Sequence, residues 1–221
     1  MARKHDKREP RTPLLVLTSN ETEASFFSQM RRDCRYANMD VVQKDPDIED
    51  MIQMIKTAGK LKRIHGYTSV WCITNPIDLK MSTERYTEYE NLAKRRKVSV
   101  VYNNPGIELW FYLHFGVPSD DITNVDEVIE GLRTYIPDYS STPSFFTSES
   151  GMQFYLRLFP NKAQAALYAG ELIKRVGRIP WGDTSRLGSN MTSFLTDVTD
   201  ACGRCYVSHS QFFSRHEENH D

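Results

Sequence analysis

Short apolar runs divide the first half of the chain. The strongest are residues 14–17 (LLVL), 69–73 (SVWCI) and 98–102 (VSVVY), and residues 40–43 form a weaker run. Runs of this length that consist mainly of apolar residues are typical of strands buried on both faces of a sheet. The pattern therefore predicts a sheet of about four strands.

Longer segments with apolar residues at helical spacing separate these runs. Residues 21–32 carry aromatic and methionine side chains at that spacing, and a second helix is predicted to start at Asp47. Residues 82–97 predict a third helix with Ser82 as its capping residue. The segment NNPGIELWFYLHF predicts a fourth helix, opened by Asn104.

Strands that alternate with helices predict an α/β protein with a mostly parallel sheet flanked by helices. After Phe115 the pattern becomes largely helical, with candidate helices at residues 125–135, 161–176 and 187–201. We therefore expect four parts in the chain: a flexible basic arm (1–12), an α/β core (13–116), a helical C-terminal part packed on that core (117–205) and a tail (206–221).

Three polar segments follow the three strongest strands. They are residues 18–23 (TSNETE), 74–78 (TNPID) and 103–108 (NNPGIE). Ligands of open parallel sheets bind beyond the carboxyl ends of the strands, so these segments are expected to form one site.

Composition adds little to this picture. The 28 basic and 29 acidic residues give a net charge of −1, so any nucleic-acid surface has to be local. No apolar run approaches the roughly 20 residues that a bilayer-spanning helix needs. The basic N-terminus has no apolar segment of the kind found in secretory signals. We expect a cytoplasmic protein that does not contact a membrane.

Two motifs resemble those of the RloB-like family, whose core is similar to the Toprim fold of topoisomerases, primases and OLD-family nucleases. The segment NNPGIELWFYLHF resembles the NP-x-x-E-L-W-x-x-x-H-F signature of that family through Glu108, Trp110 and His114. Thr22 and Glu23, followed by two phenylalanines, resemble a second motif. The resemblance covers most of residues 13–200 and implies a Toprim-like fold.

The chain departs from the acidic pattern of Toprim enzymes. Their first-strand glutamate aligns with Ser19 or Thr18, and their Asp-x-Asp pair aligns with Asn75 and Ile77. None of these four residues is acidic. Asp78 lies one position beyond the expected pair.

The remaining acids leave two interpretations open. Magnesium prefers carboxylate oxygens, and Glu23, Asp78 and Glu108 are the candidate ligands, with Asn75 as a helper and Glu21 as a spare. Three acids suffice for one ion rather than for two-metal phosphoryl transfer. Alternatively, the glutamates only complement the dipoles of the helices that they begin, and Asp78 only caps a turn.

His114 also has two interpretations. It is a candidate general base within the family motif. It also shares a helix face with Trp110, four residues earlier, which favours a packed histidine with a hydrogen-bonded ring nitrogen.

Positive charge is concentrated in two segments, LKRIHG (61–66) and KRRK, the latter formed by Lys94, Arg95, Arg96 and Lys97. Basic residues at the end of a helix complement its dipole without any ligand. Four consecutive cations exceed that need, so Lys94 to Lys97, together with Lys80, are candidate phosphate contacts for RNA or DNA.

The cysteines permit a weaker hypothesis. Cys202 and Cys205 have the spacing of half a zinc site with His209 close behind, and a fourth ligand would have to be His216 or His220. Reduced thiols near the end of a helix are the alternative.

The resemblance implies an effector of a prokaryotic anti-phage system that works with an ABC-type ATPase of the RloA or OLD kind, as a homo-oligomer or hetero-complex. One hypothesis is a magnesium-dependent nuclease that hydrolyses phosphodiesters, with Glu23, Glu108, Asn75 and His114 in its catalytic site. The other is a Toprim module that has lost its metals and serves as a nucleic-acid-binding protein or as a scaffold for the ATPase.

Overall fold

The computed structural model describes residues 13–177, 183 and 185–203. The expected basic arm, the tail and Cys205 lie outside these residues. None of the helices in the described part has the length and apolar character needed to cross a bilayer.

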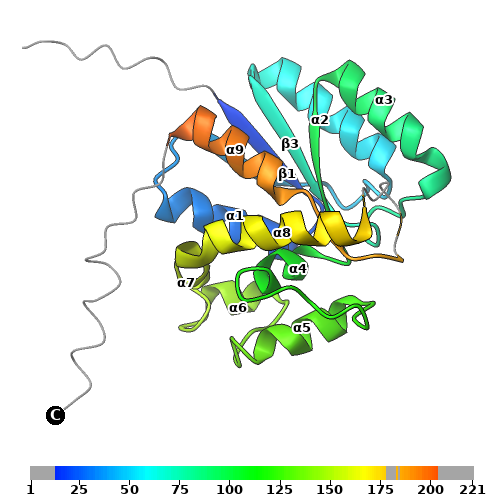
Figure 1. Cartoon of the computed structure of the whole chain (residues 1–221). Coiled ribbons are helices and arrows are strands. Elements are labelled where there is room, and N and C mark those ends of the chain that lie inside the picture. The colour runs from blue at the N-terminus through cyan, green and yellow to red at the C-terminus, as the bar shows by residue number, and fades with distance from the viewer. Residues whose placement is uncertain (1–12, 178–182, 184, 204–221) are drawn as a thin grey trace, which may run out of the picture.

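The five-stranded sheet has the order β2–β1–β3–β4–β5. Figure 1 shows strands β1 and β3 of this sheet with helices around them. The parallel strands are β1 (Leu14–Thr18), β2 (Met39–Gln43), β3 (Ser69–Thr74) and β4 (Ser99–Asn104), and the two-residue β5 (Gly188–Ser189) pairs antiparallel with β4. The predicted α/β class and mostly parallel sheet are confirmed. The fifth strand was not predicted because two residues leave no periodic pattern.

Nine α-helices surround this sheet in the described part of the chain. They are α1 (Glu21–Asp33), α2 (Met51–His65), α3 (Tyr86–Arg96), α4 (Ile107–Tyr112), α5 (Val125–Arg133), α6 (Pro143–Thr147), α7 (Phe154–Leu158), α8 (Lys162–Val176) and α9 (Met191–Cys202). Two short 3₁₀ helices, η1 (Thr83–Arg85) and η2 (Phe159–Asn161), precede α3 and α8.

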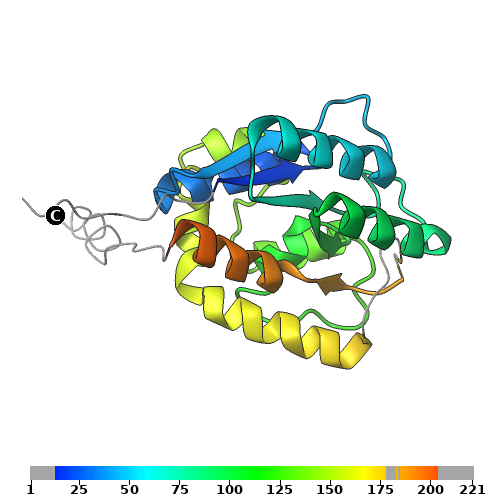
Figure 2. The same cartoon turned by 90° about the horizontal axis from the view of Figure 1, so that it is seen from above.

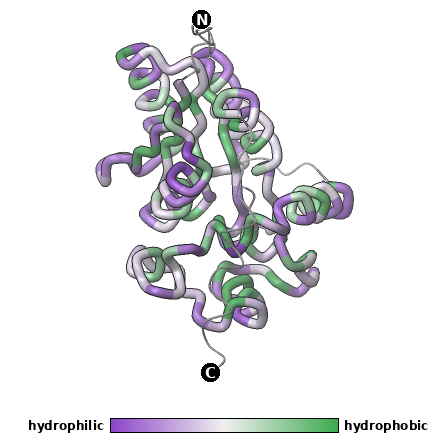
Figure 3. Tube along the Cα trace, turned by 90° about the vertical axis from the view of Figure 1, so that its left-hand side faces the viewer, coloured by the Kyte–Doolittle hydropathy of each residue, from purple (hydrophilic) through white to green (hydrophobic). Residues whose placement is uncertain are grey.

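The sheet separates two hydrophobic cores. Helices cover both of its faces (Figure 2). Leu15, Leu17 and Cys72 face α2 and α3, whereas their strand neighbours Leu14 and Val16 face α1 and the C-terminal helices. Successive side chains of a strand point to opposite faces, so an uninterrupted apolar run supplies both cores. Hydrophobic residues accordingly concentrate in the strands and on the helix sides that face them (Figure 3).

The helical C-terminal part packs on the same side of the sheet as α1. An aromatic cluster joins Phe26 of α1 to Phe111 of α4 and Phe154 of α7, with ring centroids 4.7 and 6.3 Å from that of Phe26. Because β5 also belongs to this part of the chain, the core and the helical part share one sheet and one apolar interior.

Several predicted helix starts are wrong. Helix α2 begins at Met51 with Asp50 as its cap, because the Asp50 carboxylate accepts a hydrogen bond from the backbone N–H of Gln53 (2.8 Å). Ser82 precedes η1 rather than α3, and its hydroxyl donates to Glu84 instead of accepting from a backbone N–H.

The other two errors involve residues that belong to the sheet. Asn104 is the last residue of β4, and its side chain donates to the carbonyl oxygen of Asp183 (3.1 Å) instead of capping a helix. Helix α4 therefore begins three residues later, at Ile107. Similarly, α9 starts at Met191 because the two residues of β5 precede it.

Candidate functional site

The three polar segments predicted from the sequence follow β1, β3 and β4 at the carboxyl edge of the sheet. The backbone N–H of Ser19 donates to the carbonyl oxygen of Ile73 (3.1 Å), which fixes the first segment beside the second. Helix α1 then starts with Asn20 as its cap, since the Asn20 side chain accepts from the N–H of Glu23 (2.9 Å). This start directs Glu23 back toward the strand ends.

Glu23 is completely buried. Its Oε2 accepts hydrogen bonds from the backbone N–H (2.8 Å) and hydroxyl (2.9 Å) of Ser19, whereas Oε1 has no partner among the described residues. The pKa of this carboxyl is raised to about 8: burial is the largest cause, the charges of Asp78 and Glu108 add to it, and the Ser19 hydrogen bonds oppose the shift. Glu23 is therefore mostly protonated at neutral pH.

Asp78 accepts hydrogen bonds from two side-chain amides and also lies within hydrogen-bond distance of the Ser19 hydroxyl. Its Oδ2 lies 3.1 Å from Ser19 Oγ, 2.6 Å from Asn20 Nδ2 and 2.7 Å from Asn75 Nδ2. The Asn75 Oδ1 in turn accepts from the backbone N–H groups of Ile77 (3.1 Å) and Asp78 (2.9 Å). Asn75 was predicted as a catalytic helper. In the structure it orients the loop after β3 and Asp78, the acid of that loop.

Glu108 is buried next to the start of α4, with 4% of its surface exposed. Its Oε1 accepts from the Tyr139 hydroxyl (3.2 Å) and from the Ser141 hydroxyl. Its Oε2 lies over Gly106, where an added Cβ would come within 2.6 Å of that oxygen. Glu108 is therefore packed against the backbone and held by two hydroxyl donors.

Tyr139 and Ser141 were missed by sequence reasoning. They follow α5 in a polar loop, about thirty residues after Glu108, and no motif links them to it. Burial, followed by the neighbouring charge of Glu108, raises the pKa of the Tyr139 hydroxyl well above its usual range, so this group stays a donor. Ser19 and Asn20 were also missed as donors, although their place directly after β1 was a usable signal.

Hydrogen bonds through Ser19 link two of the three carboxyl groups, those of Glu23 and Asp78. Ser19 Oγ lies within hydrogen-bond distance of both Glu23 and Asp78, and Glu108 is close enough to affect the pKa of Glu23. Within residues 13–177, 183 and 185–203, no three His, Cys, Asp or Glu side chains form a group that could hold a metal ion. This arrangement does not fit magnesium, and the spare acid Glu21 is exposed.

His114 is buried, and its Nδ1 lies 2.9 Å from the carbonyl oxygen of Trp110. Burial lowers the pKa of its imidazole to about 4, so the ring is neutral at physiological pH. The ring lines an apolar cavity beside α8 and α9.

The structure separates the KRRK segment, but not Lys80, from the carboxylates. Lys80 follows β3 and pairs with Glu49 (2.7 Å). Residues 94–97, however, end α3 immediately before β4, at the amino edge of the sheet. The acids follow strands and the KRRK segment precedes one, so the two groups lie at opposite edges of the sheet.

The possible zinc ligands lie largely outside the described residues. Cys202 is buried at the end of α9. Its predicted partners Cys205, His209, His216 and His220 are not among the residues that the structure describes.

Comparison with known proteins provides one match. The sequence model of the family described as RloB-like protein matches residues 14–185, which include β1 to β4 and all the carboxyl-edge residues described above. Searches of curated proteins and of solved structures found no match. Because the family model covers more than half of the sequence, the chain belongs to the RloB-like protein family.

Proposed function

We propose that this chain is a nucleic-acid-binding module of a prokaryotic anti-phage system, working with an ABC-type ATPase of the RloA or OLD kind. In this proposal the carboxyl-edge acids maintain the structure and do not catalyse hydrolysis. Family membership supports the cellular setting. The observation that carries the binding function is a set of unpaired cations at the amino edge of the sheet.

These cations form what we call the amino-edge basic surface: Lys62, Arg63, Arg95, Arg96 and Lys97. They surround an open hollow of about 660 Å³, which Tyr67 also lines. The last four are exposed, and none of them forms an ion pair within the part of the chain that the structure describes. Unpaired exposed cations around a hollow are suited to bind a phosphate backbone.

Lys62 connects two segments of the amino-edge basic surface. Its ammonium group donates to the carbonyl oxygens of Thr68 (2.7 Å) and Lys97 (2.9 Å), which joins the loop after α2 to the end of α3. The surface therefore has a fixed shape and leaves its arginines to contact a ligand. An adjacent tyrosine, Tyr67, offers a ring on which a base can stack.

The location of this surface argues against hydrolysis of the bound strand. A nucleic acid bound at the amino edge would lie at the opposite end of the strands from Glu23 and Glu108. The basic residues and the two acids therefore cannot act on the same phosphate group. Binding without cleavage is the activity that this separation favours.

The test is fluorescence anisotropy with single-stranded and double-stranded RNA and DNA at several salt concentrations. We expect Arg63→Ser/Arg95→Ser to weaken binding to all sequences equally and to lower the slope of log K against log salt by about two. The control Lys56→Ser/Lys174→Ser removes the same charge from exposed helix positions outside the surface. Equal loss in both double variants, or no binding by the wild type, would reject the proposal.

A second candidate, magnesium-assisted phosphodiester hydrolysis, is favoured by one observation. The buried Oε1 of Glu23 has no partner among the described residues, and the neighbouring acids raise the pKa of that carboxyl. A bound cation would give Oε1 a partner and would offset the repulsion between the acids, provided that the three carboxylates moved together around it. Glu23, Asp78 and Glu108 would then be its ligands.

Calorimetric titration of Mg²⁺ and Mn²⁺ distinguishes the two candidates. We expect no saturable binding at millimolar metal. A saturable site that is lost in both Glu23→Ala and Glu108→Ala would instead support the hydrolase and justify a screen of RNA and DNA substrates. Loss in only one variant, with unchanged nucleic-acid binding, would indicate a metal site unrelated to the proposed function.

A further inference from the structure

We propose that a cavity lined by α1, α4, α7, α8 and α9 is a binding site for a small aromatic molecule that carries an N–H or O–H donor. The cavity volume is about 400 Å³, within the range of small-molecule sites in proteins. It lies on the face of the sheet that α1 and the C-terminal helices cover, away from the amino-edge basic surface. The inference therefore stands independently of the proposed function.

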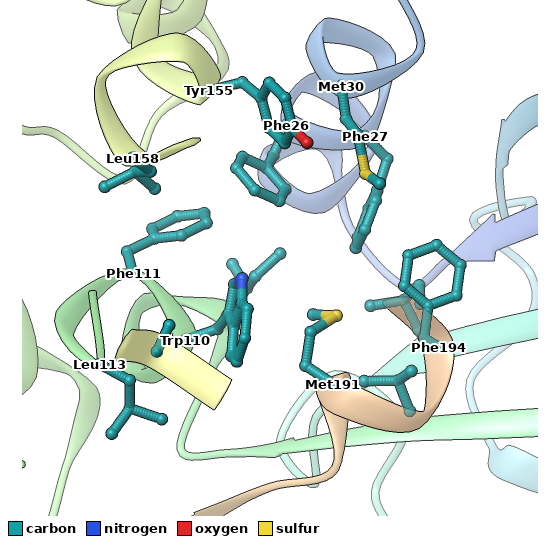
Figure 4. Close-up of a cluster of buried hydrophobic side chains, with 14 of the residues drawn as sticks. Phe26, Phe27, Met30, Trp110, Phe111, Leu113, Tyr155, Leu158, Met191 and Phe194 are labelled. Atoms are coloured by element: carbon teal, nitrogen blue, oxygen red, sulfur yellow. The ribbon is translucent and has the colours of Figure 1, made fainter. Parts of the chain in front are cut away.

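The walls of this cavity are aromatic and aliphatic. Phe26 and Phe27 come from α1, Trp110 from α4, Tyr155 from α7 and Met191 from α9. Figure 4 shows these side chains directed toward one another from the different helices. Aromatic rings and a methionine form a surface that accepts a flat apolar ligand and adapts to its outline.

His114 supplies the polar feature that selects the ligand. It is 4% exposed and lines the cavity, and its Nδ1 faces the carbonyl oxygen of Trp110. An imidazole nitrogen that faces a carbonyl oxygen carries the hydrogen, so Nε2 of this neutral ring is an acceptor. No donor to Nε2 is present among the described residues. An acceptor that lines an apolar cavity without a protein donor is available to a ligand N–H or O–H.

Several other polar groups of the cavity are acceptors, beside the hydroxyl groups of Tyr36, Tyr155 and Thr192. Thr196 and Thr199 already donate their hydroxyl hydrogens to carbonyl oxygens of α9 itself, at 3.1 and 2.8 Å, and Asp200 adds a carboxylate. The one cation in the lining, Lys162, lies over the ring of Phe159, 4.3 Å from its centroid. This composition favours a ligand with hydrogen-bond donors over an anionic one.

The cavity is connected to the carboxyl-edge network through two helices. Phe26 and Phe27 follow Glu23 by about one helical turn, and Trp110 lies two residues after Glu108. A ligand in the cavity would therefore contact the helices that carry both buried carboxyls.

The probe for this site is indole, with 1-methylindole as its matched control. The two molecules have similar apolar surfaces, but methylation removes the N–H donor. By calorimetry we expect saturable binding of indole and an affinity at least about tenfold lower for 1-methylindole, equivalent to the loss of one hydrogen bond. Nitrogen-15 NMR of the histidine rings should show the His114 Nε2 resonance shifting with indole and not with 1-methylindole.

Two tryptophan substitutions on α8 test the location. Ala166 lines the cavity, so Ala166→Trp should fill it and abolish indole binding. Leu167 is 63% exposed and does not line it, so Leu167→Trp should bind indole as the wild type does. Indole binding that survives Ala166→Trp, equal affinity for both probes, or no binding up to the solubility limit would overturn the proposal. If Ala166→Trp does not fold, the His114 resonance decides the question.

Discussion

The charged side chains at the two edges of the sheet differ in their burial and in their partners. At the carboxyl edge, Glu23 and Glu108 are buried and Asp78 is half-buried, and these three acids accept hydrogen bonds from neutral donors, as Glu108 does from Tyr139 and Ser141. At the amino edge, cations such as Arg63 and Arg95 are exposed without an ion-pair partner among the described residues. Buried charge needs partners within the protein, whereas exposed unpaired charge is available to a ligand. The amino edge is therefore the better candidate for binding a charged ligand.

The largest expected effect concerns the pH dependence of stability. The pKa of Glu23 is about 8 in the folded chain and 4.5 as a free carboxyl, so folding takes up a proton between these values. The contribution of Glu23 to the free energy of unfolding should therefore be highest below about pH 4.5 and fall by up to about 1.4 kcal/mol per pH unit as the pH rises toward 8. Urea unfolding of the wild type beside Glu23→Gln at several pH values measures this difference.

The Glu23→Gln variant is the control because it keeps the shape of the side chain and cannot titrate. A stability difference between the two proteins that does not change from about pH 5 to about pH 8 would show that Glu23 is ionised when folded. The contrast between the two edges would then be weaker than proposed.

The second effect concerns the donors to Glu108. Tyr139→Phe/Ser141→Ala should lower the free energy of unfolding by about 3 kcal/mol, because a buried carboxylate loses both hydroxyl donors. The phenylalanine keeps the ring contacts of Tyr139 with Phe111 and Phe154. The same double change in a Glu108→Leu background should cost much less, and an equal cost in both backgrounds would mean that packing explains the loss.

A third, smaller effect is expected at Asn75. Asn75→Ala removes an acceptor for two backbone N–H groups and a donor to Asp78, and should cost about 2 kcal/mol. Asn75→Asp keeps the acceptor but places a second negative charge beside Asp78, so it should be destabilising at pH 7 and recover at acidic pH. Thermal unfolding at both pH values checks this, and an Asn75→Asp protein that is stabilised by added magnesium would favour the hydrolase candidate.

The smallest effect is expected at the amino edge. Lys62→Met keeps the apolar stem of the side chain but removes the donor to the carbonyl oxygens of Thr68 and Lys97, at a cost of about 1 kcal/mol. The ammonium group also fixes the end of α3. Nucleic-acid binding should therefore weaken more than is expected from the loss of one positive charge. A salt dependence that changes by about one unit of slope, with no further loss, would assign Lys62 only an electrostatic role.

Much of the fold was predictable because apolar runs and helical stripes are local signals. The starts of α4 and α9 were not, since Asn104 and residues 188–189 belong to the sheet through partners about eighty residues away. The carboxyl-edge location of Glu23, Asp78 and Glu108 followed from their position after strands. Their donors Tyr139 and Ser141 could not be predicted, because the contact depends on how the helical part folds back.

The separation of the basic segment from the acids was predictable in principle. The KRRK segment directly precedes a predicted strand, and parallel strands begin at one edge and end at the other. Combining both segments in one nuclease site overlooked this polarity. The identity of the cavity, by contrast, depends on side chains from five helices and has no sequence signature.

The short strand β5 also limits where a further strand could be added to the sheet. Beyond its two residues, the side-chain amide of Asn190 accepts from the backbone N–H of Tyr102 (2.7 Å) and donates to the carbonyl oxygen of Val100 (3.0 Å). A single asparagine thus occupies hydrogen-bonding positions that an added strand would need along β4. Within the described residues, the far side of β2 carries no such cover, so a polypeptide that joins this sheet by strand addition would have to pair with β2.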